Sequence, residues 1–92
     1  MKNKKLLFTG GGGVFTETIW REMSSKYDIY FADINPKKIF HKIPNSRKLK
    51  IEKGTSKKFM ISLKSLIKKY NFDLIIPNVD EEIFNMINSK FK

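Results

Sequence analysis

A run of four consecutive glycines is the part of this sequence best suited to bind a ligand. The run consists of Gly10, Gly11, Gly12 and Gly13, between the apolar segment Leu6–Thr9 and a segment with helical periodicity. Glycine tolerates positive φ and lets a ligand approach the backbone closely. The N-terminus of a following helix adds free N–H groups and the positive end of its dipole. The run therefore predicts a phosphate or carboxylate site, with a tight strand-to-helix turn as the alternative.

Two groups of acidic residues stand where they could line the same site. Asp33 ends a second apolar segment, twenty residues after Gly13. This spacing suits the acid that binds a ribose hydroxyl in dinucleotide folds, although an Asp at this place is also a common turn former. Asp80, Glu81 and Glu82 follow a later apolar segment and could hold a substrate amine or Mg²⁺. Helix capping and first-turn charge are the simpler explanation of these three acids.

Strands and helices must position these residues, and the apolar pattern indicates where they lie. Short apolar segments predict strands at residues 4–9, 28–33, 48–51 and 73–77. Helical periodicity predicts helices at residues 14–26 and around 59–70, and a third after Asp80. In the first helix, Phe15, Ile19 and Met23 are expected to face the core. Thr55 or Ser56 is expected to cap the second helix.

The alternation of strands and helices predicts the fold class. It implies parallel strands joined by right-handed crossovers, with helices on both faces of the sheet. We therefore expect a Rossmann-like α/β fold of three layers, α/β/α, with a short parallel sheet of about four strands in the order 3-2-1-4. In that order the fourth strand is an apolar edge without a neighbour. We accordingly expect residues 1–92 to form one domain, the N-terminal piece of a longer protein.

Composition narrows the classes of partner. The chain has no cysteine and no apolar run of membrane-spanning length, so we expect a cytoplasmic protein without disulfides or thiolate metal sites. Its net charge is +10, and residues 37–69 hold twelve Lys or Arg against one acid. Only two residues of the chain are Arg, the usual side chain for reading bases. We therefore interpret the lysines as a compositional bias and do not expect specific nucleic-acid binding.

Three segments, taken in order, carry a resemblance to a known family. They are Leu6–Gly13, Tyr30–Pro36 and Phe72–Glu82. Together they resemble the N-terminal, pre-ATP-grasp domain of carbamoyl-phosphate-synthase-like ATP-grasp proteins. That family commonly shows a TGAGG-like loop and an acid that ends the second strand. It also shows one segment that consists of Asp, three apolar residues, Pro, two variable residues, Asp and Glu, in that order. The resemblance covers almost the whole chain.

The resemblance implies a role in a ligase. Such proteins use ATP and Mg²⁺ to activate a carboxylate as an acyl phosphate, which then reacts with an amine. ATP and Mg²⁺ bind mainly in ATP-grasp domains, so this chain would need such a domain in the same or a separate chain. Gly10–Gly13 and Asp80–Glu81 would then close part of the site for a small carboxylate or amine substrate. The family's nucleotide-binding lysines and Mg²⁺-binding acids have no counterpart here, so we expect the chain alone to be inactive.

Two other interpretations stay open, as does assembly into a homo-oligomer. The first is an NAD-binding fragment similar to short-chain dehydrogenases and epimerases, in which Gly10–Gly13 and Asp33 would contact NAD. Against it, the glycines are consecutive, and Thr16 stands where a third spaced glycine would fall. The second is a non-catalytic basic module whose binding to DNA or RNA would weaken steeply with salt.

Overall fold

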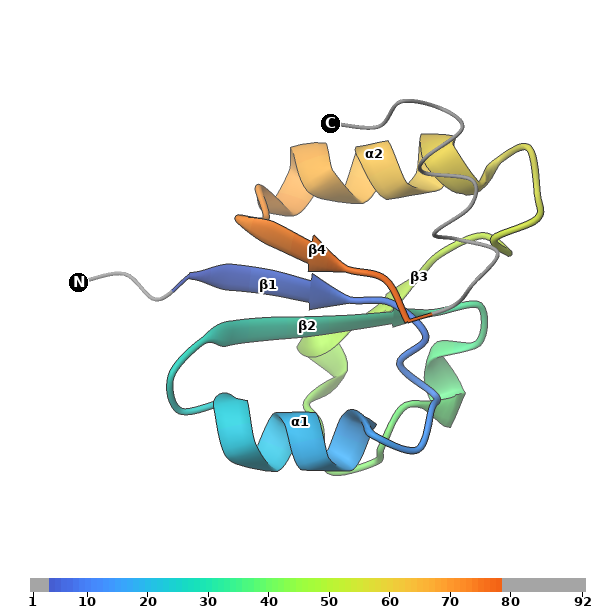
Figure 1. Ribbon diagram of the computed structural model, residues 1–92. Coiled ribbons are helices and arrows are strands. Elements are labelled where there is room, and N and C mark those ends of the chain that lie inside the picture. The colour runs from blue at the N-terminus through green and yellow to red at the C-terminus, as the bar shows by residue number, and fades with distance from the viewer. Residues whose placement is uncertain (1–3, 79–92) are drawn as a thin grey trace.

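The structure, a computed structural model, describes residues 4–78 and contains a parallel sheet between two helices (Figure 1). The elements are β1 (Lys5–Phe8), α1 (Thr16–Met23), β2 (Asp28–Asp33), β3 (Lys48–Lys50), α2 (Phe59–Tyr70) and β4 (Leu74–Ile76). Two 3-10 turns, Pro36–Lys38 and Asn45–Arg47, connect β2 to β3. The strand order is β3-β2-β1-β4 and every neighbouring pair is parallel, which confirms the predicted fold class. The helix expected after Asp80 lies outside the described residues.

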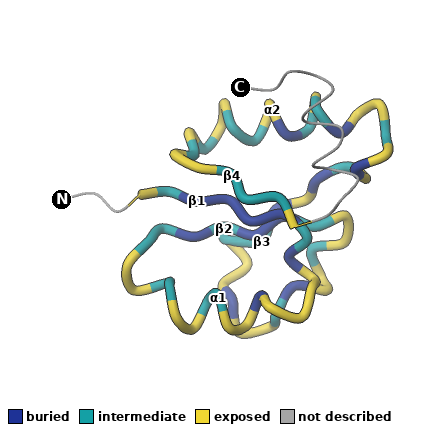
Figure 2. The backbone as a smooth tube through the Cα atoms, in the orientation of Figure 1, coloured by how far each residue is buried: buried dark blue, intermediate teal, exposed yellow. Residues whose placement is uncertain are grey.

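The central strands β1 and β2 are largely buried on both faces, and this explains why they are continuously apolar. On one face, Leu6 and Phe8 of β1 pack with Ile29 and Phe31 of β2 against α1. On the other face, Leu7 of β1 packs with α2 residues. Figure 1 shows the two helices on opposite sides of the sheet, and Figure 2 shows the dark, buried segments concentrated in the strands between them. Strands covered on both faces have no polar side to alternate with the apolar one.

The first helix departs from the sequence-based prediction at its N-terminus. Phe15 was expected to face the core, but its side chain is 73% exposed because it lies in the turn before α1. Thr16 takes the inward position instead, and its Oγ1 donates to the carbonyl of Gly11 at 2.7 Å. The inner face then continues through Ile19, Trp20 and Met23, which pack on the sheet.

The second helix ends as predicted but begins differently. Asn71 has a φ of 58°, and its N–H donates to the carbonyl of Ile67, so it closes the helix in a left-handed conformation. The expected cap by Thr55 or Ser56 is wrong, because Lys58 is the N-cap residue and makes no side-chain capping bond. Ser56 Oγ accepts from the N–H of Lys58 at 3.0 Å within the preceding turn. Neither helix described in residues 4–78 is long and apolar enough to cross a membrane.

Removing the fully buried aromatic side chain at the start of α2 should test how strongly the domain depends on this face. Phe59 is fully buried, so Phe59→Ala is expected to lower the free energy of unfolding by about 3–5 kcal/mol. Ile61 lies on the same helix but is 71% exposed, so Ile61→Ala should change the free energy of unfolding by no more than about 0.5 kcal/mol. Urea denaturation of both variants measures the difference. Equal midpoints for the two variants would contradict the described packing of α2.

Candidate functional site at the carboxyl ends of the strands

The candidate site lies where the chain leaves β1, β2 and β4. The connection from β1 leads to β2 on one side, whereas β4 pairs with β1 on the other, so the topology switches between β1 and β4. Ligands of open α/β sheets bind beyond the carboxyl ends of the strands at such a switch point. The structure brings the predicted Gly10–Gly13 loop and Asp33 together at this edge, at the arrow ends of the strands in Figure 1. Asp80 and Glu81 lie outside the described residues.

A pair of hydrogen bonds fastens the exit of β4 to the exit of β1. Thr9 is fully buried, and its Oγ1 accepts from the backbone N–H of Asn78 at 3.2 Å. The side-chain amide of Asn78 donates to the carbonyl of Thr9 at 3.1 Å. Sequence reasoning gave neither residue a role of its own. The available signal was a polar residue directly after the first apolar strand and another two residues after the fourth, where an unpaired polar group would be costly.

The glycine loop is closed by hydrogen bonds to the rest of the chain. The N–H of Gly11 donates to the carbonyl of Ala32 at 2.9 Å, and the N–H of Gly12 donates to Asp33 Oδ2 at 2.7 Å. The N–H of Gly13 donates to the carbonyl of Gly10 at 3.0 Å. Three of the amides that would cradle an anion are therefore paired within the protein. The loop is preformed, and an incoming anion would have to compete with these acceptors.

Close packing gives a structural reason for the glycines. Gly10 has a φ of 65°, a conformation that disfavours side chains. A Cβ on Gly11 would lie 3.0 Å from Phe31 Cβ, and one on Gly12 would lie 2.9 Å from Asp33 Oδ2. The loop thus lies tightly against the end of β2. These contacts support the alternative interpretation of the glycine run, which is a tight strand-to-helix turn that holds its shape.

Asp33 acts as the anchor of the glycine loop. Its Oδ2 accepts from Gly12, and its Oδ1 accepts from the N–H of Asn35 at 3.0 Å. A dinucleotide site would instead direct the carboxylate at a ribose diol. Here each oxygen already accepts a backbone N–H. The acid predicted for ligand binding therefore joins the loop after β1 to the turn after β2.

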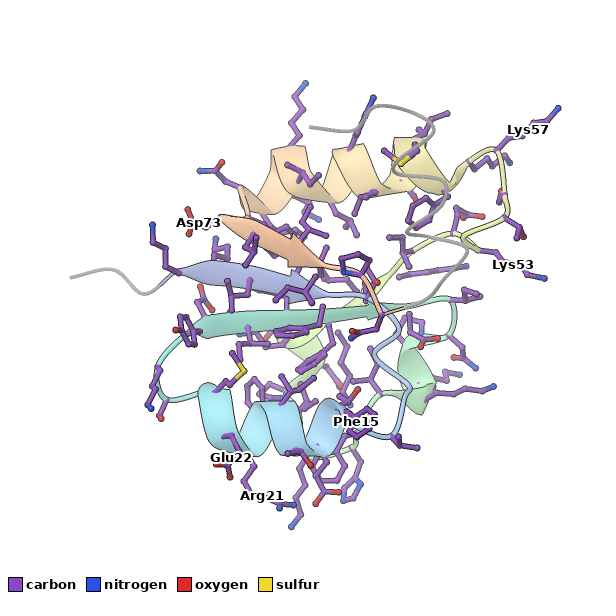
Figure 3. The ribbon with its side chains drawn as sticks, in the orientation of Figure 1. Phe15, Arg21, Glu22, Lys53, Lys57 and Asp73 are labelled. Carbon is purple, nitrogen blue, oxygen red and sulfur yellow. The ribbon has the colours of Figure 1, made fainter. Side chains whose placement is uncertain are left out.

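Apolar side chains flank this edge and are exposed to solvent. Val14 is 88% exposed and Phe15 73%, both directly after the glycines, and Ile34 after Asp33 is 53% exposed. Figure 3 shows Phe15 at the end of α1 that adjoins the loop. Exposed apolar groups beside a candidate site are typical of a surface that contacts another domain or a ligand.

A large pocket at the opposite edge is a weaker candidate. It has a volume of about 670 Å³ and lies at the amino ends of the strands. Four of its five charged side chains already have partners: Arg47 pairs with Asp28, Asp73 accepts from the backbone N–H of Lys5, and Lys5 Nζ donates to the carbonyl of Tyr70. In residues 4–78, no three His, Cys, Asp or Glu side chains gather where they could hold a metal ion.

Comparison with known proteins finds no family model and no curated sequence that matches this chain. The function must therefore be inferred from the geometry at the carboxyl ends of the strands.

Hydrogen exchange should reveal the anchoring role of Asp33. In Asp33→Ala the Gly12 amide loses its acceptor, and its exchange should accelerate by about tenfold, which corresponds to about 1.4 kcal/mol. The Gly11 amide is the internal control, because its acceptor is the carbonyl of Ala32. Amide exchange followed by NMR measures both sites. Equal acceleration at Gly11 and Gly12 would instead indicate general loosening of the domain.

Proposed function

We propose that this chain is the substrate-side, pre-ATP-grasp domain of an ATP-grasp ligase that joins a carboxylate to an amine. The proposal is supported by the resemblance of its three motifs to that family. It is also supported by the meeting of the first two motifs and Asn78 of the third at one sheet edge, through the Gly12–Asp33 and Thr9–Asn78 hydrogen bonds. In this role the chain forms one wall of the site, and ATP and Mg²⁺ bind to a separate ATP-grasp domain.

The closed glycine loop is the observation that carries the proposal. A nucleotide-binding loop holds phosphates with free backbone N–H groups at a helix N-terminus. Here the amides of Gly11, Gly12 and Gly13 are already paired. A preformed wall with few free donors suits a domain that shapes a substrate site while the phosphates bind elsewhere. The same pairing, and the engagement of both Asp33 oxygens, disfavours the NAD-binding alternative.

The exposed apolar residues supply the second argument. Val14, Phe15 and Ile34 would lose their contact with water if a second domain packed on this edge. Such packing would enclose the substrate between the two domains. ATP, bound with Mg²⁺ in the second domain, would supply the phosphoryl group that activates the carboxylate, with ADP as the leaving group. Residues of this chain would orient the carboxylate or amine, with Asp80 and Glu81 proposed to hold the amine.

The kinetic consequence is a selective change in the KM values. In the native protein purified from its source cells, Gly12→Ala should raise the KM for the carboxylate or the amine by about tenfold, equivalent to about 1.4 kcal/mol. A Cβ there would press on Asp33 and reshape the loop. The KM for ATP should be unchanged, because ATP contacts the other domain. ADP release is measured with bicarbonate or free amino acids as the carboxylate and ammonium as the amine, and Ile61→Ala is the control.

Three results would contradict the proposal. One is an equal rise in the KM for ATP. Another is a native mass of 10.8 kDa without a co-purifying ATP-grasp chain. The third is micromolar binding of NAD⁺ that Asp33→Ala abolishes, which would favour the dinucleotide interpretation.

A further inference from the structure

The two helices cover opposite faces of one sheet, yet their charges differ. The solvent side of α1 carries Glu17, Arg21 and Glu22, and Glu17 pairs with Arg21. The helix α2 carries three lysines and no acid, and two more lysines directly precede it. A compositional bias toward lysine would act on both helices alike. The difference between them therefore requires a cause that is specific to the α2 side.

The lysines of α2 and of the turn directly before it make up a surface that we call the lysine face. Its members are all exposed: Lys57, Lys58, Lys64, Lys68 and Lys69. Ile61, Lys64 and Lys68 follow the spacing of one helical face, and Lys57 lies in the turn before the helix. Figure 3 shows Lys57 and nearby Lys53 extending away from the loop that precedes α2. No acid occurs in the sequence from Lys53 to Phe72.

The N-terminal part of this arrangement opposes the ordinary electrostatics of a helix, whereas Lys68 and Lys69 lie in the last turn, where the dipole favours cations. Lys64 and Lys68 are four residues apart, where like charges repel. Lys57 and Lys58 stand at the positive end of the helix dipole, and the first turn has no acid. The two ion pairs found within residues 4–78 both lie elsewhere. A local rule broken without a compensating ion pair among residues 4–78 is typical of a functional surface. An external polyanion would offset the repulsion.

We propose that the lysine face binds the phosphodiester backbone of nucleic acid without reading its sequence. Lysine binds phosphate as a point charge, whereas bidentate base recognition depends on arginine, and this face contains none. The scarcity of arginine predicts that the chain does not recognise specific base sequences. Binding to the phosphate backbone does not require such recognition, so the two are compatible. Between Lys58 and Lys69 the helix rises about 16 Å, over which one strand of B-form DNA carries about five phosphates.

Other polyanions fit the surface less well. A helix that lies on a bilayer inserts an apolar face, but Phe59 and Leu63 of α2 are fully buried against the sheet. Protein interfaces usually have an apolar or aromatic centre, and the lysine face offers only Ile61. A row of ammonium groups with almost no apolar surface suits a phosphate backbone best. The proposal does not rest on the proposed ligase function.

Fluorescence anisotropy with labelled 20-base-pair duplexes of two unrelated sequences tests the proposal on the full 92-residue chain. Both duplexes should bind equally, with a micromolar Kd near 50 mM salt. With about four phosphates neutralised, affinity should fall about 150-fold between 50 and 200 mM salt. Absence of binding at 50 mM salt, or a clear preference for one sequence, would overturn the proposal.

A charge-matched pair of variants separates the lysine face from the net charge. Lys64→Glu with Lys68→Glu should weaken binding at least about tenfold and reduce the salt slope by about two units. Lys26→Glu with Lys42→Glu changes the net charge equally at exposed positions outside the lysine face and should retain most of the affinity. Circular dichroism confirms that both variants fold. Equal losses in the two variants, or wild-type binding to phosphatidylserine vesicles in preference to DNA, would refute the proposed surface.

Discussion

The burial of β1 is the constraint on which the rest of this domain depends. Leu6, Leu7 and Phe8 are all buried, and β1 pairs with β2 on one side and with β4 on the other. A strand enclosed in this way needs a helix on each face, and α1 and α2 supply them. Because β1 is central in the sheet, the chain leaves this strand in the middle of the molecule. The chain must then turn sharply beside the end of β2, and the glycine loop makes that turn.

The closure of the loop has a functional consequence. Backbone N–H groups that are already paired are not available to bind a phosphate. The preformed loop therefore contributes a fixed shape to the site in place of free donors. The hydrogen bonds at Asp33 and Asn78 connect the exits of three strands into one rigid edge. An edge that is rigid, short of free donors and flanked by exposed apolar residues suits the contact surface of a second domain. This is the physical basis for proposing a ligase subunit whose nucleotide binds elsewhere.

The domain separates two kinds of surface. The apolar residues Val14, Phe15 and Ile34 lie at the carboxyl edge, whereas the lysine face lies on the outer side of α2. The two proposed partners, a protein domain and a nucleic-acid backbone, would therefore contact different regions. Because the sheet spaces the helices apart, a change of charge on α2 can be made without altering the contacts of the glycine loop.

The sequence by itself determined the kinds of element and their order. Continuous apolar strands predicted a sheet covered on both faces, and the order 3-2-1-4 was expected because it is the usual order of this fold class. The tertiary structure alone decided how the site residues are used. Gly12 and Asp33 are 21 residues apart, and Thr9 and Asn78 are 69 apart, so no local pattern could pair them. The inward turn of Thr16 in place of Phe15 likewise depends on its hydrogen bond to Gly11. Periodicity records which side of an element is buried, whereas hydrogen bonds between distant segments form only when the fold brings them together.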